Sequence, residues 1–246
     1  MMHEPAPLLL KLFAAHLFGD YIVQSPRVAD QKHRGAMLGL HVLLHGALLA
    51  LVGLTEPAST RLWLALAALL AAHAAIDAWT SRRKPRDLRL LVIDQSLHAA
   101  TLIGAVAVAR PLEAAVWARA AAAAGGAARL WTLLAGAGAA VWMGAVVVGR
   151  WVEPFAAHLG ERHPGLARAG RMIGLIERAL IFIAVLLRIE ALVGFVVAAK
   201  AILRFPEIRE PGHQALAEYY LVGSLASVLW AVVIGVLTRW ALTGRP

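Results

Sequence analysis

The sequence predicts an all-α fold, a polytopic membrane bundle of about seven transmembrane helices. Two observations lead to this prediction. First, 60% of the 246 residues are hydrophobic and 16% are charged, whereas soluble domains are roughly 45–50% apolar and about 25% charged. Second, the apolar residues gather in segments long enough to cross a bilayer, which takes roughly 20 residues per helix. Little sequence is left over for a separate soluble domain.

Glycine, proline and charged residues divide the sequence into seven expected spans. They cover residues 7–24, 36–54, 61–79, 88–109, 129–150, 173–199 and 214–241. The N-terminus lacks the basic leader of a cleaved signal, so we expect it to form the first span. Residues 1–125 are expected to form a four-helix membrane domain, and residues 126–246 a three-helix membrane region packed on it. Residues 120–126 and 151–171 are expected along the membrane surface.

The formal net charge of +9 is expected to set the orientation of the chain in the membrane. With the N-terminus outside, the inside loops and the C-terminal tail hold 14 Lys and Arg residues, and the outside loops hold seven. This bias predicts an outside N-terminus, a cytoplasmic C-terminus and membrane lipids as partners. The sequence contains no motif for reading RNA or DNA, so nucleic acid is not an expected partner. The lack of cysteine excludes disulfide bonds and thiolate metal ligands.

Each of the first four spans carries two potential metal ligands four residues apart. The pairs are His16 and Asp20, His41 and His45, His73 and Asp77, and Asp94 and His98. Residues at this spacing lie on one helix face, about one turn apart, where they can chelate one ion or orient one another. All five histidines in these spans belong to such pairs. The pattern predicts a site to which all four helices contribute.

Burial in a membrane makes such groups costly, at about 2.5–3.5 kcal/mol each on insertion scales, unless they face one another, a cation or water. Helical bundles build metal sites from side chains that converge in this way. Imidazole and carboxylate ligands without sulfur suit zinc, manganese, iron or nickel. We expect zinc, with manganese or iron as alternatives. For any single pair, a hydrogen bond within the helix or a polar contact between helices is the alternative explanation.

A second group of polar residues could bind an anion or a substrate. Gln24 and Gln95 lie close to the predicted ligands, where they could contact substrate or cap a polar patch. The sixth span and the segment after it carry four basic side chains that could hold a phosphate headgroup: Arg178, Arg188, Lys200 and Arg204. Ion pairing within the membrane and snorkelling to its surface are the simpler explanation for these four.

Several strings of the sequence resemble a bacterial family of small polytopic membrane proteins, the domain-of-unknown-function 3307 family. In the first half these strings are HLFGDYIVQ (16–24), HVLLH (41–45), HAAID (73–77) and DQSLH (94–98). In the second half they are IGLIER (173–178), AAKAILRF (198–205) and AEYYLVGSLAS (217–227). The resemblance implies a location in the bacterial plasma membrane but no activity. The sequence has a looser similarity to membrane-bound metal-dependent hydrolases, although it lacks their usual His-Arg and Thr-His-Ser patterns.

Three functions fit these observations. The first is a metal-dependent hydrolase that acts on a phosphoester in a lipid or isoprenoid substrate, with the metal activating water. In that case Asp20, Asp77 or Asp94 would act as general base. The second is a transporter of divalent cations or protons, in which the same residues line a pathway. The third is a non-catalytic assembly protein in which the polar residues fix helix packing.

Overall fold

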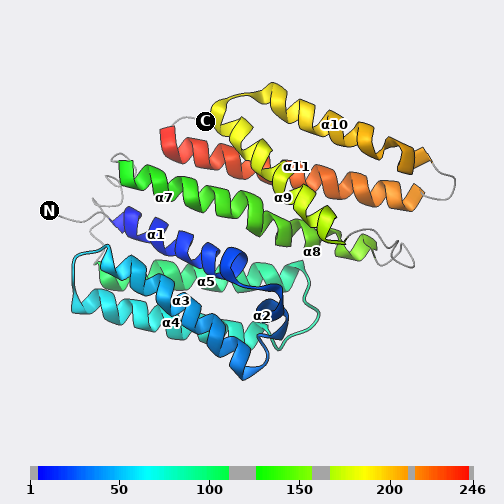
Figure 1. Ribbon diagram of the computed structural model, residues 1–246. Coiled ribbons are helices and arrows are strands. Elements are labelled where there is room, and N and C mark those ends of the chain that lie inside the picture. The colour runs from blue at the N-terminus through cyan, green and yellow to red at the C-terminus, as the bar shows by residue number, and fades with distance from the viewer. Residues whose placement is uncertain (1–4, 111–125, 157–166, 210–213, 244–246) are drawn as a thin grey trace. The chain divides into compact units, whose positions relative to one another are not determined.

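The computed structural model describes residues 5–110, 126–156, 167–209 and 214–243, and every regular element in these ranges is a helix (Figure 1). Five helical segments are long and apolar enough to cross a membrane: Gly35–Leu54, Thr60–Thr80, Leu88–Ala109, Ala128–Ala156 and Ala215–Thr243. The predicted all-α, polytopic membrane bundle is therefore confirmed. The number of seven spans stays a prediction. The predicted surface helix at 120–124 and the middle of the predicted surface stretch at 151–171 lie outside the described residues.

The chain forms two compact units that divide between Gly138 and Ala139. The first unit contains α1 (Pro5–Leu17), η1 (Phe18–Val23), α2 (Pro26–Gln31), α3 (Gly35–Leu54), α4 (Thr60–Thr80), α5 (Leu88–Ala109) and α7 (Gly126–Ala137). The predicted division of the chain at residue 125 stays a prediction. The packing of the C-terminal region on the N-terminal domain stays a prediction.

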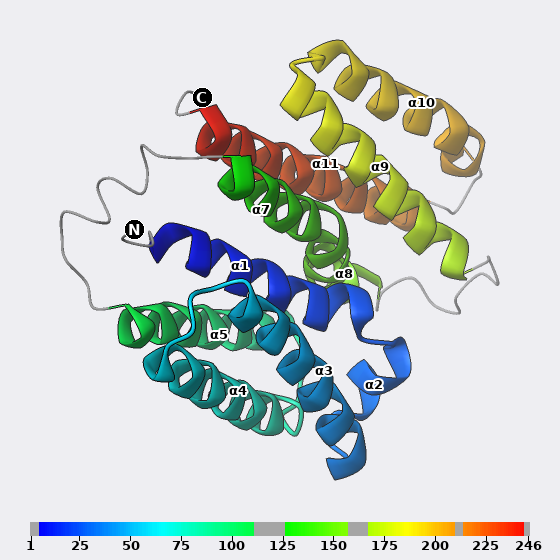
Figure 2. The same ribbon diagram turned by 60° about the vertical axis from the view of Figure 1, so that its left-hand side comes forward.

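Four helices of the first unit form a closed bundle. α1 packs against α3, α3 against α4, α4 against α5, and α5 against α1, while α7 lies against the outer side of α1 (Figure 2). Local sequence explains where two of these helices begin. Ser59 accepts a hydrogen bond from the backbone N–H of Leu62, and Asp87 accepts one from Leu90, so each side chain caps the first turn of its helix.

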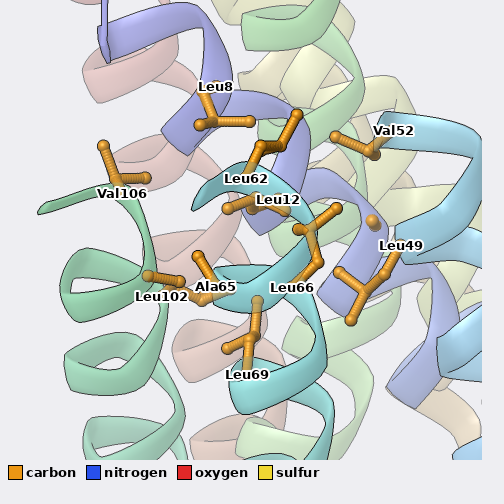
Figure 3. Close-up of a cluster of buried hydrophobic side chains, with 12 residues drawn as sticks. Leu8, Leu12, Leu49, Val52, Leu62, Ala65, Leu66, Leu69, Leu102 and Val106 are labelled. Atoms are coloured by element: carbon orange, nitrogen blue, oxygen red, sulfur yellow. The ribbon is translucent and has the colours of Figure 1, made fainter. Parts of the chain in front are cut away.

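The interior of this bundle is apolar over one half of its length. Figure 3 shows side chains from α1, α3, α4 and α5 directed toward one another in this half. The last apolar layer consists of one leucine from each helix, and we call it the leucine layer: Leu12, Leu49, Leu69 and Leu102. In each helix a histidine lies four residues, or about one turn, from the leucine of this layer, on the side away from the apolar half. These histidines are His16, His45, His73 and His98. The leucine layer therefore separates the apolar half of the bundle from a polar half.

The outward faces of the same helices are also apolar. Leu43 of α3 is 70% exposed, and Leu51 and Leu64 are exposed to a similar extent. Soluble proteins rarely display large contiguous apolar surfaces. A bundle that is apolar outside and polar within one half of its interior has the side-chain distribution expected of a membrane protein with an internal site.

The second unit contains most of η2 (Gly138–Met143), with α8 (Gly144–Ala156), α9 (Ala167–Leu187), α10 (Glu190–Arg209) and α11 (Gln214–Thr243). The prediction of one continuous span over 173–199 is wrong, because the helix breaks at Arg188, which has φ of 59°. The backbone N–H of Ile189 bonds to the carbonyl of Ala184 and closes α9. The chain then reverses, and α10 packs against α9.

Candidate metal centre

The four predicted ligand pairs meet inside the bundle of the first unit. Asp20 lies in η1, directly after α1, and the other pairs lie on α3, α4 and α5. The five imidazoles are buried, each with 5% exposure or less: His16, His41, His45, His73 and His98. The carboxylate side chains of Asp20 and Asp77 are 7% and 3% exposed. The predicted convergence of the four spans on one site is therefore observed.

The tightest part of the site surrounds Asp20. Its Oδ1 lies 3.1 Å from Nε2 of His41 and 3.2 Å from Nε2 of His45. Nε2 of His73 is 4.0 Å from the same oxygen and 3.1 Å from Nε2 of His41. Oδ2 of Asp77 lies 2.9 Å from Nε2 of His41 and 3.3 Å from Nε2 of His73. Five nitrogen and oxygen atoms thus converge on one small volume.

These separations fit the coordination shell of a metal ion. Nitrogen and oxygen ligands lie 2.0–2.2 Å from zinc, so two ligands of a tetrahedral ion are about 3.3–3.6 Å apart. The observed range of 2.9–4.0 Å brackets that value. Oδ1 of Asp20 and Nε2 of His45 are buried without a hydrogen-bond partner among the described residues. We call Asp20, His41, His45 and His73 the first ligand set, and it could hold a metal ion.

The other side of the cluster is built by α1 and α5. Nδ1 of His98 lies 3.0 Å from the backbone carbonyl of Asp94 and donates to it, which leaves Nε2 free to act as a ligand. The amide of Gln95 donates to Oδ2 of Asp94, and its Oε1 lies 3.2 Å from Nε2 of His16. His16, Asp20 and His98 form the second ligand set, with ligand atoms within 4.8 Å of one another.

Local backbone geometry brings Asp20 into the site. η1 is a π-helical turn, a form that is rare and occurs frequently at functional sites. Its residue Gly19 lies against the His45 ring so closely that a Cβ atom would overlap the imidazole. The tight approach of η1 to α3 therefore requires glycine at this position. Only a helix-to-loop transition is evident from the sequence, so the role of Gly19 was not predicted.

Lys32 is a site residue that sequence reasoning missed. Its ammonium group lies 3.0 and 3.2 Å from the two oxygens of Asp77 and 3.6 Å from Oδ1 of Asp20. Burial alone would lower the pKa of Lys32, but the nearby carboxylates of Asp20 and Asp77 raise it above its usual value. Lys32 therefore supplies a fixed positive charge beside the ligands. It lies in the turn after α2, where the sequence pattern indicated an ordinary loop residue.

The remaining predicted site residues are divided between the two units: the glutamines lie in the first unit and the basic residues in the second. Gln95 lies in the cluster, and Oε1 of Gln24 is buried without a partner among the residues described. The four basic residues proposed for an anion site belong to the second unit: Arg178, Arg188, Lys200 and Arg204. Arg178 donates to Ser227 and to the Val141 carbonyl, which lies in the π-helical η2.

Lys200 is bonded to Glu177 at 2.6 Å, and Arg188 lies at the break between α9 and α10. The side chain of Arg204 lies outside the described residues.

The architecture and the site define an all-α, multi-pass membrane protein with a buried cluster of imidazoles and carboxylates. Residues 8–122 match the model of a family described as "Protein of unknown function (DUF3307)". The predicted resemblance to that family is confirmed over these residues, which include all four ligand pairs. A search of curated proteins and a search of solved structures gave no match.

Proposed function

We propose that this protein is a metal-dependent hydrolase of the bacterial plasma membrane that acts on a phosphoester of a lipid or isoprenoid substrate. The observation that carries the proposal is the convergence of five imidazoles and two carboxylates from four helices on one buried point. Their nitrogen and oxygen atoms favour zinc, with manganese or iron as alternatives. When bound, the ion would activate water and offset charge on the phosphoryl oxygens.

The position of the cluster along the helices suits a lipid phosphate. Asp77 lies three residues before the end of α4 at Thr80, which corresponds to about 5 Å along the helix axis. The headgroup region adjoins the ends of spanning helices. The loop after α4 carries Arg82, Arg83, Lys84 and Arg86. A positive loop at the same end of the bundle would attract an anionic headgroup. By the distribution of basic residues, this end faces the cytoplasm.

Asp94 is the carboxylate best placed to act as general base. Its side chain is 15% exposed, more than those of Asp20 and Asp77, and it belongs to none of the ligand sets. Its Oδ1 has no hydrogen-bond partner within the described part of the chain. In the proposed reaction Asp94 takes a proton from water. The water oxygen forms a bond to phosphorus, the ester P–O bond breaks, and the proton passes to the departing alkoxide.

The test uses purified full-length protein, loaded with zinc, and vesicles that contain phosphatidic acid or an isoprenyl phosphate. We expect release of inorganic phosphate that stops when a chelator removes the metal. In an Asp94→Asn variant, release should fall by about 100-fold or more, since general-base catalysis contributes that much. Its metal content should stay unchanged. Asp30→Asn is the matched control, because Asp30 is exposed in α2 of the same unit.

Other outcomes would favour the other two functions. Bound metal without phosphate release, together with metal-dependent uptake into liposomes, would replace the hydrolase with a transporter. Protein that folds and binds no transition metal would leave the cluster with a packing role only. Elemental analysis of the purified protein and of a His41→Ala/His45→Ala variant separates that last outcome from the first two.

A further inference from the structure

We propose that the cluster is a binuclear centre, in which the Asp20 carboxylate bridges two divalent metal ions. This inference rests on the proposed function and extends it from one ion to two. The first observation is the number of ligands. Seven side chains belong to the groups that could hold an ion: His16, Asp20, His41, His45, His73, Asp77 and His98. A single zinc ion takes about four ligands and, at a catalytic site, about three from the protein.

The ligands divide into two sets that share one residue. The first ligand set is built on α3 and α4, and the second brings His16 from α1 and His98 from α5. Asp20 alone belongs to both sets. The ligand atoms of His73, Asp77 and His98 also lie within 4.8 Å of one another. Because His73 belongs to the first set and His98 to the second, the two sets adjoin. Adjoining sets with one common carboxylate are the arrangement of two-metal hydrolytic sites, whose ions are about 3.5–4 Å apart.

The two oxygens of Asp20 face different sets. Oδ1 points to His41 and His45, at 3.1 and 3.2 Å. Oδ2 points to His16, at 3.5 Å from its Nε2. Oδ1 is thus at a ligand-to-ligand distance from two imidazoles of the first set, and Oδ2 from one imidazole of the second set. A carboxylate oriented in this way can give one oxygen to each ion.

A small cavity adjoins the histidines of both ligand sets on the side of the leucine layer. It has room for about one water-sized particle. Its polar lining consists of Thr101 and four histidines, and its apolar wall includes the leucine layer: His16, His45, His73 and His98, with Leu12, Leu49, Leu69 and Leu102. Nε2 of His98 is buried with no hydrogen-bond partner in the described ranges. Gln95 Oε1, at 3.2 Å from His16 Nε2, adds a fourth possible ligand.

The decisive experiment counts ions in full-length protein purified in detergent and loaded with manganese. We expect about two ions per chain, and an electron paramagnetic resonance spectrum of an exchange-coupled pair. A His98→Ala variant should retain about one ion and show an isolated manganese signal, because the first ligand set is untouched. His33→Ala is the matched control, since His33 is exposed in the turn before α3. Size-exclusion profiles of both variants establish that they fold.

The possible outcomes separate this inference from the proposed function. One ion per chain in the wild type, with no loss in His98→Ala, would overturn the binuclear centre and leave a mononuclear hydrolase standing. Two ions without magnetic coupling would overturn the Asp20 bridge. No bound ion would overturn both proposals. If His98→Ala does not fold, His98→Gln in the same assay decides, because it keeps a polar side chain of similar size.

Discussion

At the scale of single residues, the close contact between Gly19 and the His45 ring bears on the geometry of the candidate metal centre. We expect Gly19→Ala to displace the His45 ring, because the added Cβ would overlap it. Overpacking of this kind lowers the free energy of unfolding by about 1–3 kcal/mol. Metal affinity should fall about 10–100-fold, as it does when the support of a ligand is lost. A metal titration and a thermal unfolding curve measure the two effects.

Gly39→Ala is the control for this substitution. Gly39 lies on α3 two residues before His41, and a Cβ there would meet nothing within 4 Å. The Gly39→Ala substitution should leave both the metal affinity and the unfolding temperature close to those of the wild type. Equal behaviour of the two variants would show that the approach of η1 to α3 does not position His45.

The ammonium group of Lys32 contacts both oxygens of Asp77, where it would compete with a bound metal ion. We therefore expect Lys32→Met to bind metal more tightly, by about tenfold, because removal of the ammonium frees both oxygens and removes a like charge. Phosphate release should decrease in the same variant, since an anionic substrate loses a positive contact. A competition titration with a coloured chelator gives the affinity.

Lys11→Met provides the comparison, because Lys11 is also paired with a buried carboxylate, at 2.6 Å from Oε1 of Glu56. It lies in the apolar half of α1, before Leu12. Its metal affinity should not change. Weaker metal binding by Lys32→Met would mean that the lysine holds Asp77 in place for the ion.

The members of the His and Asp cluster could be predicted from the sequence because each pair repeats at one-turn spacing in an apolar helix. A charged or imidazole side chain in such a segment must find a partner, which makes it conspicuous. Lys32 and Gly19 could not be predicted in this way. Lysine in a loop is ordinary, and the need for glycine arises from a contact between residues far apart in the sequence.

At the scale of helices, hydropathy located the boundaries of most elements to within a few residues. The expected spans 36–54, 61–79 and 88–109 correspond to α3, α4 and α5. The break between α9 and α10 was missed, since Leu187 and Ile189 continue the apolar run on either side of Arg188. The π-helical turns η1 and η2 were also missed, because hydropathy does not distinguish them from α-helix, and their contacts come from residues far along the chain. Arg178 bonds to a carbonyl within η2, for example.

The left-handed conformation of Arg188 leads to a prediction about this break. A residue with a Cβ pays about 1–2 kcal/mol to adopt positive φ, a cost that glycine avoids. Arg188→Gly should therefore stabilise the protein by about 1 kcal/mol, whereas Arg188→Ala should have little effect. Thermal unfolding in detergent compares the two. Destabilisation by glycine would show that the arginine side chain itself holds the two helices together.

At the scale of the whole molecule, the distribution of basic loops predicts which side of the membrane the candidate metal centre faces. Arg61 and Arg83 are exposed and lie at opposite ends of α4. Because the chain has no cysteine, Arg61→Cys and Arg83→Cys each introduce a unique label site. A membrane-impermeant maleimide added to intact spheroplasts should label Arg61→Cys and spare Arg83→Cys until the membrane is opened. The reverse pattern would place the metal centre on the outer side.

The leucine layer has an electrical consequence. A transmembrane voltage falls mainly across apolar, water-free material, which in the first unit is the half of the bundle filled by side chains such as Leu8, Leu62 and Val106. One charge that crosses the full membrane gains about 2.3 kcal/mol per 100 mV. Ions and substrates that reach the cluster from the basic end would cross little of that field. If the site has the proposed hydrolase activity, its rate would therefore be the same in energised and de-energised cells.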